Sequence, residues 1–169
     1  LVGSAIPLIA ATGSVSDALC AGSCDGTASA NASGGAGTYG YSWSSQPLQS
    51  GSNAVGLCPG TYTCTVTDAN GCTSSTVAVI ASPSVVSIDT LTGLTACAGG
   101  STSLLVTASG GTGSYQYSWS PASGLSDTAI ANPIASPLTN TVYTIIVIDA
   151  NGCTSVPANL AVPAVSGQP

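Results

Sequence analysis

The sequence contains one pattern twice, and this duplication limits the folds that the chain can adopt. In both copies a Tyr-x-Tyr-Ser-Trp-Ser segment is followed by Asp-Ala-Asn-Gly-Cys-Thr, over residues 39–73 and again over residues 115–154. Trp43 and Trp119 lie 76 residues apart. Solenoid repeats have periods of only about 20–50 residues, whereas a period near 80 matches a small domain. The chain is therefore predicted to contain two tandem domains of one fold.

Both copies have the sequence pattern of β-structure. Short alternating runs rich in Val, Ile, Thr and Tyr are separated by Gly, Ser, Asn and Pro, and no amphipathic helix pattern appears. Asn70-Gly71 and Asn151-Gly152 each lie between two such runs, which is a strong hairpin signal. The predicted fold class is all-β, with tandem Ig-like β-sandwich domains. The strands are expected at residues 14–19, 26–32, 38–44, 53–57, 61–67 and 73–81, and at 85–96, 102–108, 114–120, 129–134, 141–148 and 154–162.

The expected domain boundaries follow from the duplication. They give an N-terminal strand or linker at residues 1–13, a first repeat at 14–83, a second repeat at 84–163 and a C-terminal linker at 164–169. Residues 4–10 resemble residues 75–81, the end of the first copy's last strand. The segment 1–13 is thus either the end of a preceding repeat or a donor strand that completes a neighbouring subunit by β-augmentation.

The charge content excludes several classes of function. The chain has no Lys, Arg or His and six acidic residues, all Asp. Binding to nucleic-acid phosphates or to an anionic membrane surface requires cations, so neither partner is expected. The sequence contains no run of about 18 apolar residues, so we do not predict direct membrane insertion. Without His, and with isolated carboxylates, the usual hydrolytic arrangements cannot be assembled. We therefore predict no enzyme, no catalytic residue and no cofactor.

Seven cysteines indicate disulfide bonds and an extracellular or cell-surface location. Domains near 80 residues bury too little surface to be very stable without such crosslinks. Each copy has one early cysteine, Cys20 or Cys97, and one late cysteine, Cys72 or Cys153. Two interpretations stay open: the pairs Cys20–Cys72 and Cys97–Cys153 within the domains, or pairing across domains or subunits.

Three further cysteines occur only in the first copy. Cys24 and Cys58 are expected at the same loop end, which favours their pairing and leaves Cys64 as a buried free thiol. The spacings match no common zinc module, so no metal site is predicted among these thiols.

The aromatic residues have two interpretations. Tyr39, Tyr41 and Trp43 alternate and would share one face of a strand, as would their second-copy equivalents Tyr115, Tyr117 and Trp119. Such a ladder, if exposed, would suit sugar rings, but a Trp on the third strand of a sandwich normally packs in the core. We predict Trp43, Trp119, Tyr62 and Tyr143 as core aromatics, the two tyrosines in a position similar to a tyrosine corner.

The Asp-Ala-Asn-Gly turns are weak calcium candidates. Asp68 and Asp149 could each contribute a carboxylate to a calcium ion. One acid per turn falls short of the several oxygens that calcium requires, and Asp and Asn are also common in turns for backbone reasons. The turn interpretation is favoured.

These motifs together resemble a known family. Cys20-Ala-Gly-Ser-Cys-Asp-Gly, the Tyr-Ser-Trp segments, Pro59-Gly-Thr-Tyr-Thr-Cys-Thr-Val-Thr and the Asp-Ala-Asn-Gly-Cys turns are similar to the SprB-type and other Ig-like adhesin repeats of Bacteroidota cell-surface proteins. The resemblance covers about residues 14–162 and implies export by the type IX system. Cys24, Cys58 and Cys64 depart from the usual pattern of these repeats.

The resemblance also implies a function and two modification sites. The expected function is a non-catalytic structural segment of an extracellular fibre or adhesin, in cell-surface attachment, gliding or filament assembly. Its expected partners are like domains or subunits, through strand edges, and surface glycans. A carbohydrate-binding accessory domain of a secreted protein is the alternative. The same phylum glycosylates Asp-Thr followed by an apolar residue, which implies O-glycans on Thr90 and Thr128.

Overall fold

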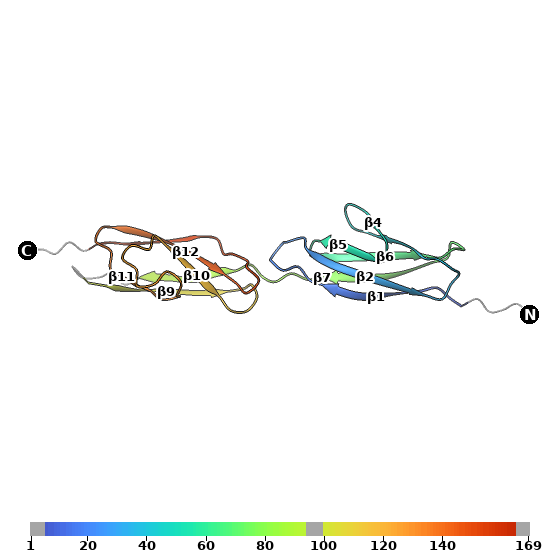
Figure 1. Cartoon of the computed structure of the whole chain (residues 1–169), viewed down its shortest axis with the longest axis horizontal. Helices are drawn as coiled ribbons and strands as arrows, with labels where there is room; N and C mark the ends of the chain where they lie inside the picture. Colours follow the sequence, from blue (N-terminus) through green and yellow to red (C-terminus); the bar gives the residue numbers. More distant parts are fainter. Residues whose placement is uncertain (1–5, 94–99, 165–169) are drawn as a thin grey trace, which may run out of the picture. The chain divides into compact units, whose positions relative to one another are not determined.

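The computed structural model describes residues 6–93 and 100–164, and the part of the chain that it describes contains strands and no helix. The chain divides into two compact units, unit 1 (Leu1–Ser82) and unit 2 (Pro83–Pro169). Figure 1 labels the main strands of both units.

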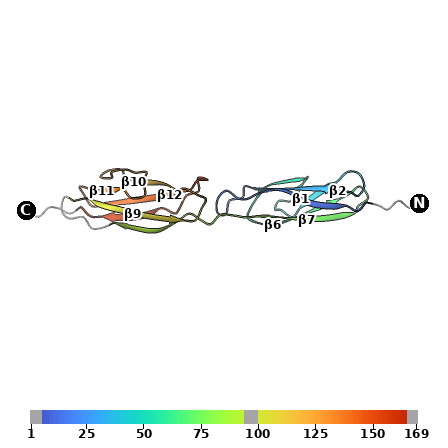
Figure 2. The same cartoon turned by 90° about the horizontal axis from the view of Figure 1, so that it is seen from below.

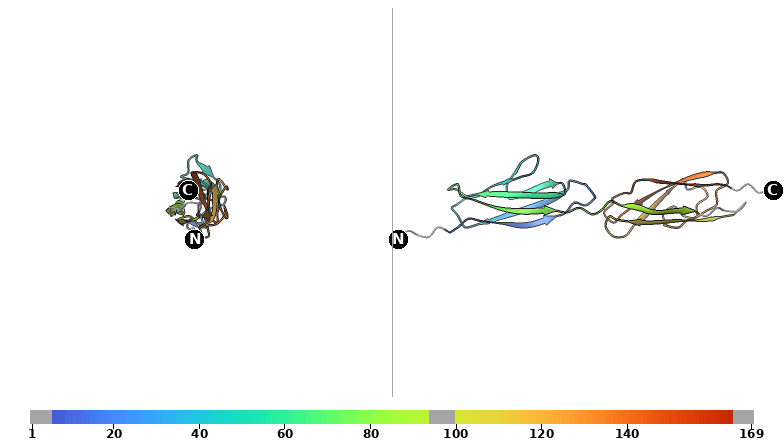
Figure 3. Two further views of the ribbon diagram at one scale, coloured as in Figure 1. Left: turned by 90° about the vertical axis from the view of Figure 1, so that its left-hand side faces the viewer. Right: turned by 180° about the vertical axis from the view of Figure 1, so that it is seen from behind.

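Unit 1 is a sandwich of two antiparallel sheets, seen from two further directions in Figures 2 and 3. One sheet has the order β1-β2-β5 and the other the order β4-β3-β6-β7. The strands are β1 (Ile9–Ser16), β2 (Gly26–Ser33), β3 (Gly40–Trp43), β4 (Gln49–Ser50), β5 (Asn53–Leu57), β6 (Gly60–Thr67) and β7 (Thr73–Ile80). The core between the sheets includes Trp43, Leu57, Cys64, Val66 and Ile80.

Unit 2 has the same two-layer arrangement. Its sheets have the orders β11-β9-β8 and β10-β12-β13. The strands are β8 (Ser87–Gly93), β9 (Thr102–Ser109), β10 (Gln116–Ser120), β11 (Ile134–Ala135), β12 (Thr141–Ile148) and β13 (Ala158–Val162). Its core includes Leu104, Val106, Trp119, Tyr143, Ile145 and Val147.

Side-chain alternation along the strands explains how the two layers form. In β12, Tyr143, Ile145 and Val147 are fully buried, while the residues between them are half-buried. Successive side chains of a strand point to opposite faces, so a period of two covers one face of the sheet and leaves the other toward solvent. The all-β Ig-like prediction is confirmed by this topology.

The predicted boundary between residues 13 and 14 is wrong, because β1 (Ile9–Ser16) crosses it. Ile9 pairs with Ser33 and Thr12 with Ala30, so residues 9–13 belong to unit 1's own sandwich and are neither a linker nor a donor strand. A register shift between Thr12 and Val15 interrupts the alternation of side chains along β1. The sequence pattern therefore does not show β1 as one continuous strand. Residues 1–5 of the predicted segment lie outside the described residues.

The strand predicted at residues 129–134 is also corrected. The structure has only the two-residue strand β11 (Ile134–Ala135) there. Residues 129–133 do not form a regular strand. Just before them, the Thr128 carbonyl accepts a hydrogen bond from the backbone N–H of Trp119 in β10 at 2.9 Å.

Candidate functional site

The two tryptophans lie in the cores of the two units, and each donates a hydrogen bond to a loop carbonyl. Trp43 and Trp119 are buried. The Trp43 Nε1–H donates to the Gly51 carbonyl at 3.0 Å, and the Trp119 Nε1–H donates to the Ile130 carbonyl at 2.9 Å. A buried indole needs such a partner for its N–H. Neither indole is available to stack on a sugar.

The tyrosines next to them tie a second pair of loops. The Tyr39 hydroxyl donates to the Gly34 carbonyl, and the Tyr115 hydroxyl donates to the Gly110 carbonyl, both at 2.6 Å. Tyr41 and Tyr117 are half-buried against the two cores. The ladder that the sequence offers as a sugar platform is therefore built into the sandwich.

Tyr143 and Tyr62 occupy equivalent positions with different burial. Tyr143 is fully buried, and its hydroxyl donates to the Ser123 carbonyl at 2.8 Å. Burial raises the pKa of the Tyr143 hydroxyl. The Tyr62 hydroxyl makes the corresponding hydrogen bond to the Cys58 carbonyl at 2.8 Å. Tyr62 is only half-buried, so the prediction of a core aromatic is corrected: its ring packs at the edge of the core.

Asp68 organises one corner of unit 1, at the end where the chain enters the sandwich. Its Oδ1 accepts hydrogen bonds from the backbone N–H groups of Asn70 and Cys72, both at 2.9 Å. Its Oδ2 accepts the Ala36 N–H at 3.0 Å. A single buried carboxylate thus joins the Asn-Gly-Cys turn to the glycine loop on the neighbouring side of the sandwich.

Asp149 makes the same corner in unit 2. Its Oδ1 accepts the N–H groups of Asn151 at 2.9 Å and Cys153 at 2.8 Å, and its Oδ2 accepts the Thr112 N–H at 2.8 Å. Gly111 faces the carboxylate, and a Cβ at that position would stand 2.5 Å from the Asp149 Oδ2 with the backbone at a φ of +62°. Glycine is therefore required where the loop approaches the aspartate.

The same hydrogen bonds keep both carboxyl groups ionised. Burial alone would raise the pKa of Asp68 and of Asp149, but the surrounding amide N–H donors outweigh it and hold both pKa values below the ordinary value. These N–H donors point the positive ends of their dipoles toward the carboxylate. They therefore stabilise its negative charge and would repel a cation bound beside it. Among the described residues, no group of three or more His, Cys, Asp or Glu side chains could hold a metal ion.

The cysteines of unit 1 follow the sequence-based expectation in part. Cys24 and Cys58, the favoured pair, form a disulfide. Cys64 is a free thiol, fully buried in the core, and burial raises its pKa.

The predicted Cys20–Cys72 pair is wrong, because Cys72 is a free and exposed thiol. Cys72 directly precedes β7, whereas Cys20 lies in the loop that contacts the residues after β7, where the Ala18 N–H donates to the Ala81 carbonyl. The eight residues of β7 span roughly 25 Å, far beyond the reach of a disulfide. Cys20 and Cys153 are each disulfide-bonded. Cys97 lies outside the described residues, so the pair Cys97–Cys153 stays a prediction.

The first and last strands of unit 1 lie side by side and run parallel, which Figure 1 also shows. The Thr12 hydroxyl donates to the Val77 carbonyl at 2.9 Å, so that it accepts from the Thr76 hydroxyl, 2.7 Å away. The Ala10 N–H donates to the Ser74 hydroxyl at 3.1 Å. We call this contact between β1 and β7 the terminal seam.

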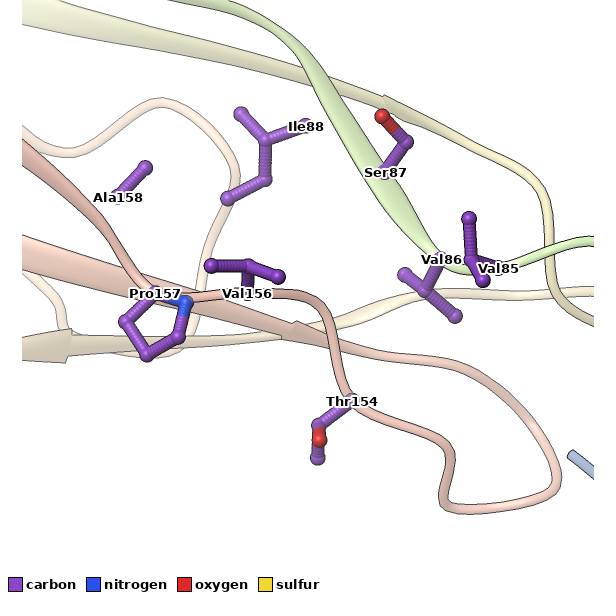
Figure 4. Close-up of a pocket in the computed structure, with 8 residues that line it drawn as sticks. All are labelled: Val85, Val86, Ser87, Ile88, Thr154, Val156, Pro157 and Ala158. Atoms are coloured by element: carbon purple, nitrogen blue, oxygen red, sulfur yellow. The ribbon is translucent and has the colours of Figure 1, made fainter. Parts of the chain in front are cut away.

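In unit 2 the equivalent seam is open. Its strands β8 and β13 are in contact, but no hydrogen bond joins them among the residues that the structure describes. A cavity of about 440 Å³ lies beside them, lined by Val85, Val86, Ser87, Ile88, Thr154, Val156, Pro157 and Ala158. Figure 4 shows these side chains around the gap between β8 and the segment that leads into β13. None of them is charged or aromatic, so the cavity has few groups with which to orient a sugar.

The two threonines expected to carry glycans are both half-buried. Thr90 lies in β8 and pairs with Thr107, and Thr128 lies in the loop whose carbonyl bonds to Trp119. O-glycosylation at Thr90 and Thr128 stays a prediction.

Comparisons with known proteins place these units in a family context. The model of the SprB repeat family matches residues 12–47 and 95–124, a segment in each unit. No curated protein matches the chain. Within residues 6–93 and 100–164, no helix is long and apolar enough to cross a membrane.

Several solved structures are similar to this chain at low sequence identity. DIP-gamma IG1+IG2 is 13% identical, with 94% of this chain and 98% of that chain covered and a TM-score of 0.45. The C-terminal intimin fragment is 13% identical, with 90% and 64% covered and a TM-score of 0.46. The fibronectin(III)-like modules of Clostridium thermocellum CbhA are 12% identical, with 93% and 94% covered and a TM-score of 0.38.

The SprB match falls in both units, and both have the two-sheet topology and the same aspartate-centred corner. The chain therefore contains two Ig-like sandwiches, each with a segment similar to the SprB repeat, and this similarity is typical of non-catalytic, structural, adhesin-like domains of cell-surface or extracellular proteins.

Proposed function

We propose that this chain is a load-bearing segment of an extracellular adhesin or fibre, which transmits tension in cell-surface attachment or gliding. The observation that carries the proposal is the path of the chain through unit 1. The chain enters beside the glycine loop, where the Ile6 carbonyl accepts the Gly35 N–H, and leaves at Ala81, whose N–H donates to the Asp17 carboxylate. The whole length of β7 separates these two points.

This path places the terminal seam under shear when the ends of unit 1 are pulled apart. β1 would be drawn toward its N-terminus and the parallel strand β7 toward its C-terminus. The bonds of Thr12 with Thr76 and Val77, and of Ala10 with Ser74, then bear the load together instead of breaking one after another. Simultaneous loading of several bonds raises the barrier to forced unfolding, which is governed by the unfolding rate.

Two internal fastenings support the same proposal. Asp68 joins the turn before β7 to the glycine loop, close to where the chain enters. The Cys24–Cys58 disulfide fastens the opposite end of the unit. Both act inside unit 1, so they would keep the sandwich closed without a ligand.

The proposed partners are like domains, with which the segment would associate outside the cell. One strand edge is already occupied: the Gln49 side-chain amide donates to the Val55 carbonyl and accepts the Val55 N–H, each at 2.9 Å. Association along strand edges would therefore use edges other than β5 at Val55. The alternative of a carbohydrate-binding module receives no support from the buried tryptophans.

The proposal is tested by stretching the chain between its ends in single-molecule force spectroscopy. We expect two separate unfolding events, with unit 1 unfolding at the higher force because its terminal seam is hydrogen-bonded. Unit 2, with its open seam, serves as the internal comparison, and a substitution in either unit assigns the events. Unfolding of unit 1 at or below the force of unit 2 would overturn the proposal.

A further inference from the structure

We propose that unit 1 contains a latent disulfide switch: once force has unfolded the unit, the Cys64 thiol attacks the Cys24–Cys58 disulfide and releases the chain between its two cysteines. The inference rests on the proposed function and deepens it, because it describes how a load-bearing segment lengthens after its terminal seam has broken. The two reaction partners are a disulfide and a buried free thiol of one sandwich.

The fold keeps these two partners apart. Cys58 lies before β6, and its carbonyl accepts a hydrogen bond from the Tyr62 hydroxyl at 2.8 Å. Cys64 lies inside β6, and roughly 13 Å of extended strand separate it from Gly60, the first residue of that strand. Disulfide-bonded cysteines have Cα atoms less than about 7 Å apart. Cys64 therefore does not reach the disulfide while β6 is intact.

The sandwich also shields the Cys64 thiol from solvent. β6 is an inner strand of its sheet, in which Cys64 pairs with Trp43 of β3 and with Thr76 of β7. The Cys64 side chain is fully buried in the core between the two sheets. Burial also raises the pKa of this thiol, which favours the protonated form, and the protonated form is not the nucleophile.

Unfolding of unit 1 removes both barriers. The terminal seam holds β7 against β1, and β7 is also the direct neighbour of β6. When tension detaches β7 and separates the sheets, Cys64 meets water and its pKa returns toward the ordinary cysteine value near 8.5. The covalent disulfide survives this step, so residues 25–57 remain without load between the two joined cysteines.

The positions of the cysteines along the chain select Cys58 as the sulfur under attack. In the unfolded chain Cys64 is only six residues from Cys58, whereas the original disulfide has a sequence separation of 34. The cost of closing a loop rises with its length, which favours the shorter loop by roughly tenfold. Tension favours the same product, because the exchange releases more chain than it encloses.

The exchange needs no other reactant. The Cys64 thiolate attacks the Cys58 sulfur and forms the Cys58–Cys64 bond, while the Cys24–Cys58 bond breaks and Cys24 leaves as a thiolate. The Cys24 thiolate takes up a proton in place of the one that Cys64 lost. One disulfide is consumed and one is formed, so the chain is neither oxidised nor reduced.

The test compares the folded and the unfolded full chain of C72S, which lacks the second free thiol. Cys72 is exposed, so this substitution should leave the fold intact. Both samples are kept at one alkaline pH without a reductant, one of them in guanidinium chloride, and an excess of an alkylating agent under denaturing conditions stops the exchange. Trypsin cannot cut a chain without Lys and Arg, but cleavage before each aspartate separates residues 17–24, with Cys24, from residues 25–67, with Cys58 and Cys64.

The two samples should give different products. From the folded chain, peptide 25–67 should stay linked to peptide 17–24 and carry an alkyl group on Cys64. From the unfolded chain it should be released without an alkyl group, because Cys58 and Cys64 now form a disulfide inside it. We expect the release to be at least about a hundredfold slower in the folded sample, since only the small unfolded fraction reacts. Peptide 25–67 that stays linked after unfolding, or that is released equally fast from both samples, overturns the proposal.

C64A/C72S is the matched control. Its peptide 25–67 should stay linked to peptide 17–24 in guanidinium chloride over the same period, and equal release without Cys64 would also overturn the proposal. Because this exchange is measured on the unfolded chain, the control holds even if C64A weakens the fold.

Force spectroscopy on the same variants tests whether tension drives the exchange. At constant force, the unfolding of unit 1 in C72S should be followed by a second increase in contour length of roughly 90–100 Å, because the sequence separation that the disulfide encloses falls from 34 to six residues. C64A/C72S should lack this second step, and its absence from C72S contradicts the proposal. The force at which unit 1 first unfolds does not depend on the second step, so the two proposals fail separately.

Discussion

Removal of the Cys24–Cys58 disulfide should destabilise unit 1 strongly and leave unit 2 unchanged. Both cysteines are exposed, so replacing them with alanine in C24A/C58A removes little packing. The main effect is a gain of freedom in the unfolded chain, since the bond closes a loop with a sequence separation of 34 residues.

The magnitude follows from the length of that loop. Chain-entropy reasoning for a loop of 34 residues gives about 3.8 kcal/mol at 25 °C. For a domain of this size each kcal/mol lowers the midpoint temperature by about 4–8 °C, so we expect a decrease of roughly 15–30 °C for unit 1.

Differential scanning calorimetry of the full chain measures this effect. The wild-type chain and C24A/C58A are compared under identical non-reducing conditions, and the transition of unit 2 serves as the internal control. A decrease below about 5 °C for unit 1 would refute the entropic reasoning, because the crosslink would then hardly restrict the unfolded state. A decrease shared equally by unit 2 would show that the two units do not unfold independently.

Three further predictions concern the buried polar groups. Y143F removes the hydroxyl that bonds to the Ser123 carbonyl and should lower the free energy of unfolding of unit 2 by about 1 kcal/mol, measured by chemical denaturation; an unchanged value would contradict the role of this bond. Because the pKa values of Asp68 and Asp149 are lowered in the folded state, their contribution is present above the ordinary aspartate pKa near 3.9 and is lost as the pH falls through the lowered values. Midpoint temperatures of both units should therefore fall below about pH 4, and D68N should flatten this dependence in unit 1 only; a D68N profile as steep as wild type would argue against it. Calcium, compared with a chelator, should leave both midpoints unchanged, since amide donors surround the two carboxylates; an increase with calcium would reveal a site.

Much of the fold could be predicted because the strands carry their pattern locally. The alternation in 61–67 and 141–148 and the two Asn-Gly turns mark hairpins that need no distant contact to be recognised. β1 was harder to recognise, because the shift between Thr12 and Val15 breaks its alternation and its partner strand lies some twenty residues away.

The candidate site depended more on contacts between distant residues. The turn role of Asp68 and Asp149 was favoured from the sequence, but their bonds to Ala36 and Thr112 cross from one loop to another and leave no local signal. The terminal seam joins residues 64 positions apart through single hydroxyl groups. No sequence signal pointed to this contact, because Thr12 was predicted to lie before the first repeat and Thr76 is one of many threonines in the predicted strands.

The most direct test of the load-bearing account is the unfolding force of T76V. This substitution keeps the shape of the side chain and removes the hydroxyl that donates to Thr12. We expect the force peak of unit 1 to fall clearly while that of unit 2 stays unchanged, and S75A, on the exposed side of the same strand, should behave like wild type. An unfolding force of unit 1 that is the same in T76V and in the wild-type chain would contradict the claim that the terminal seam carries the load.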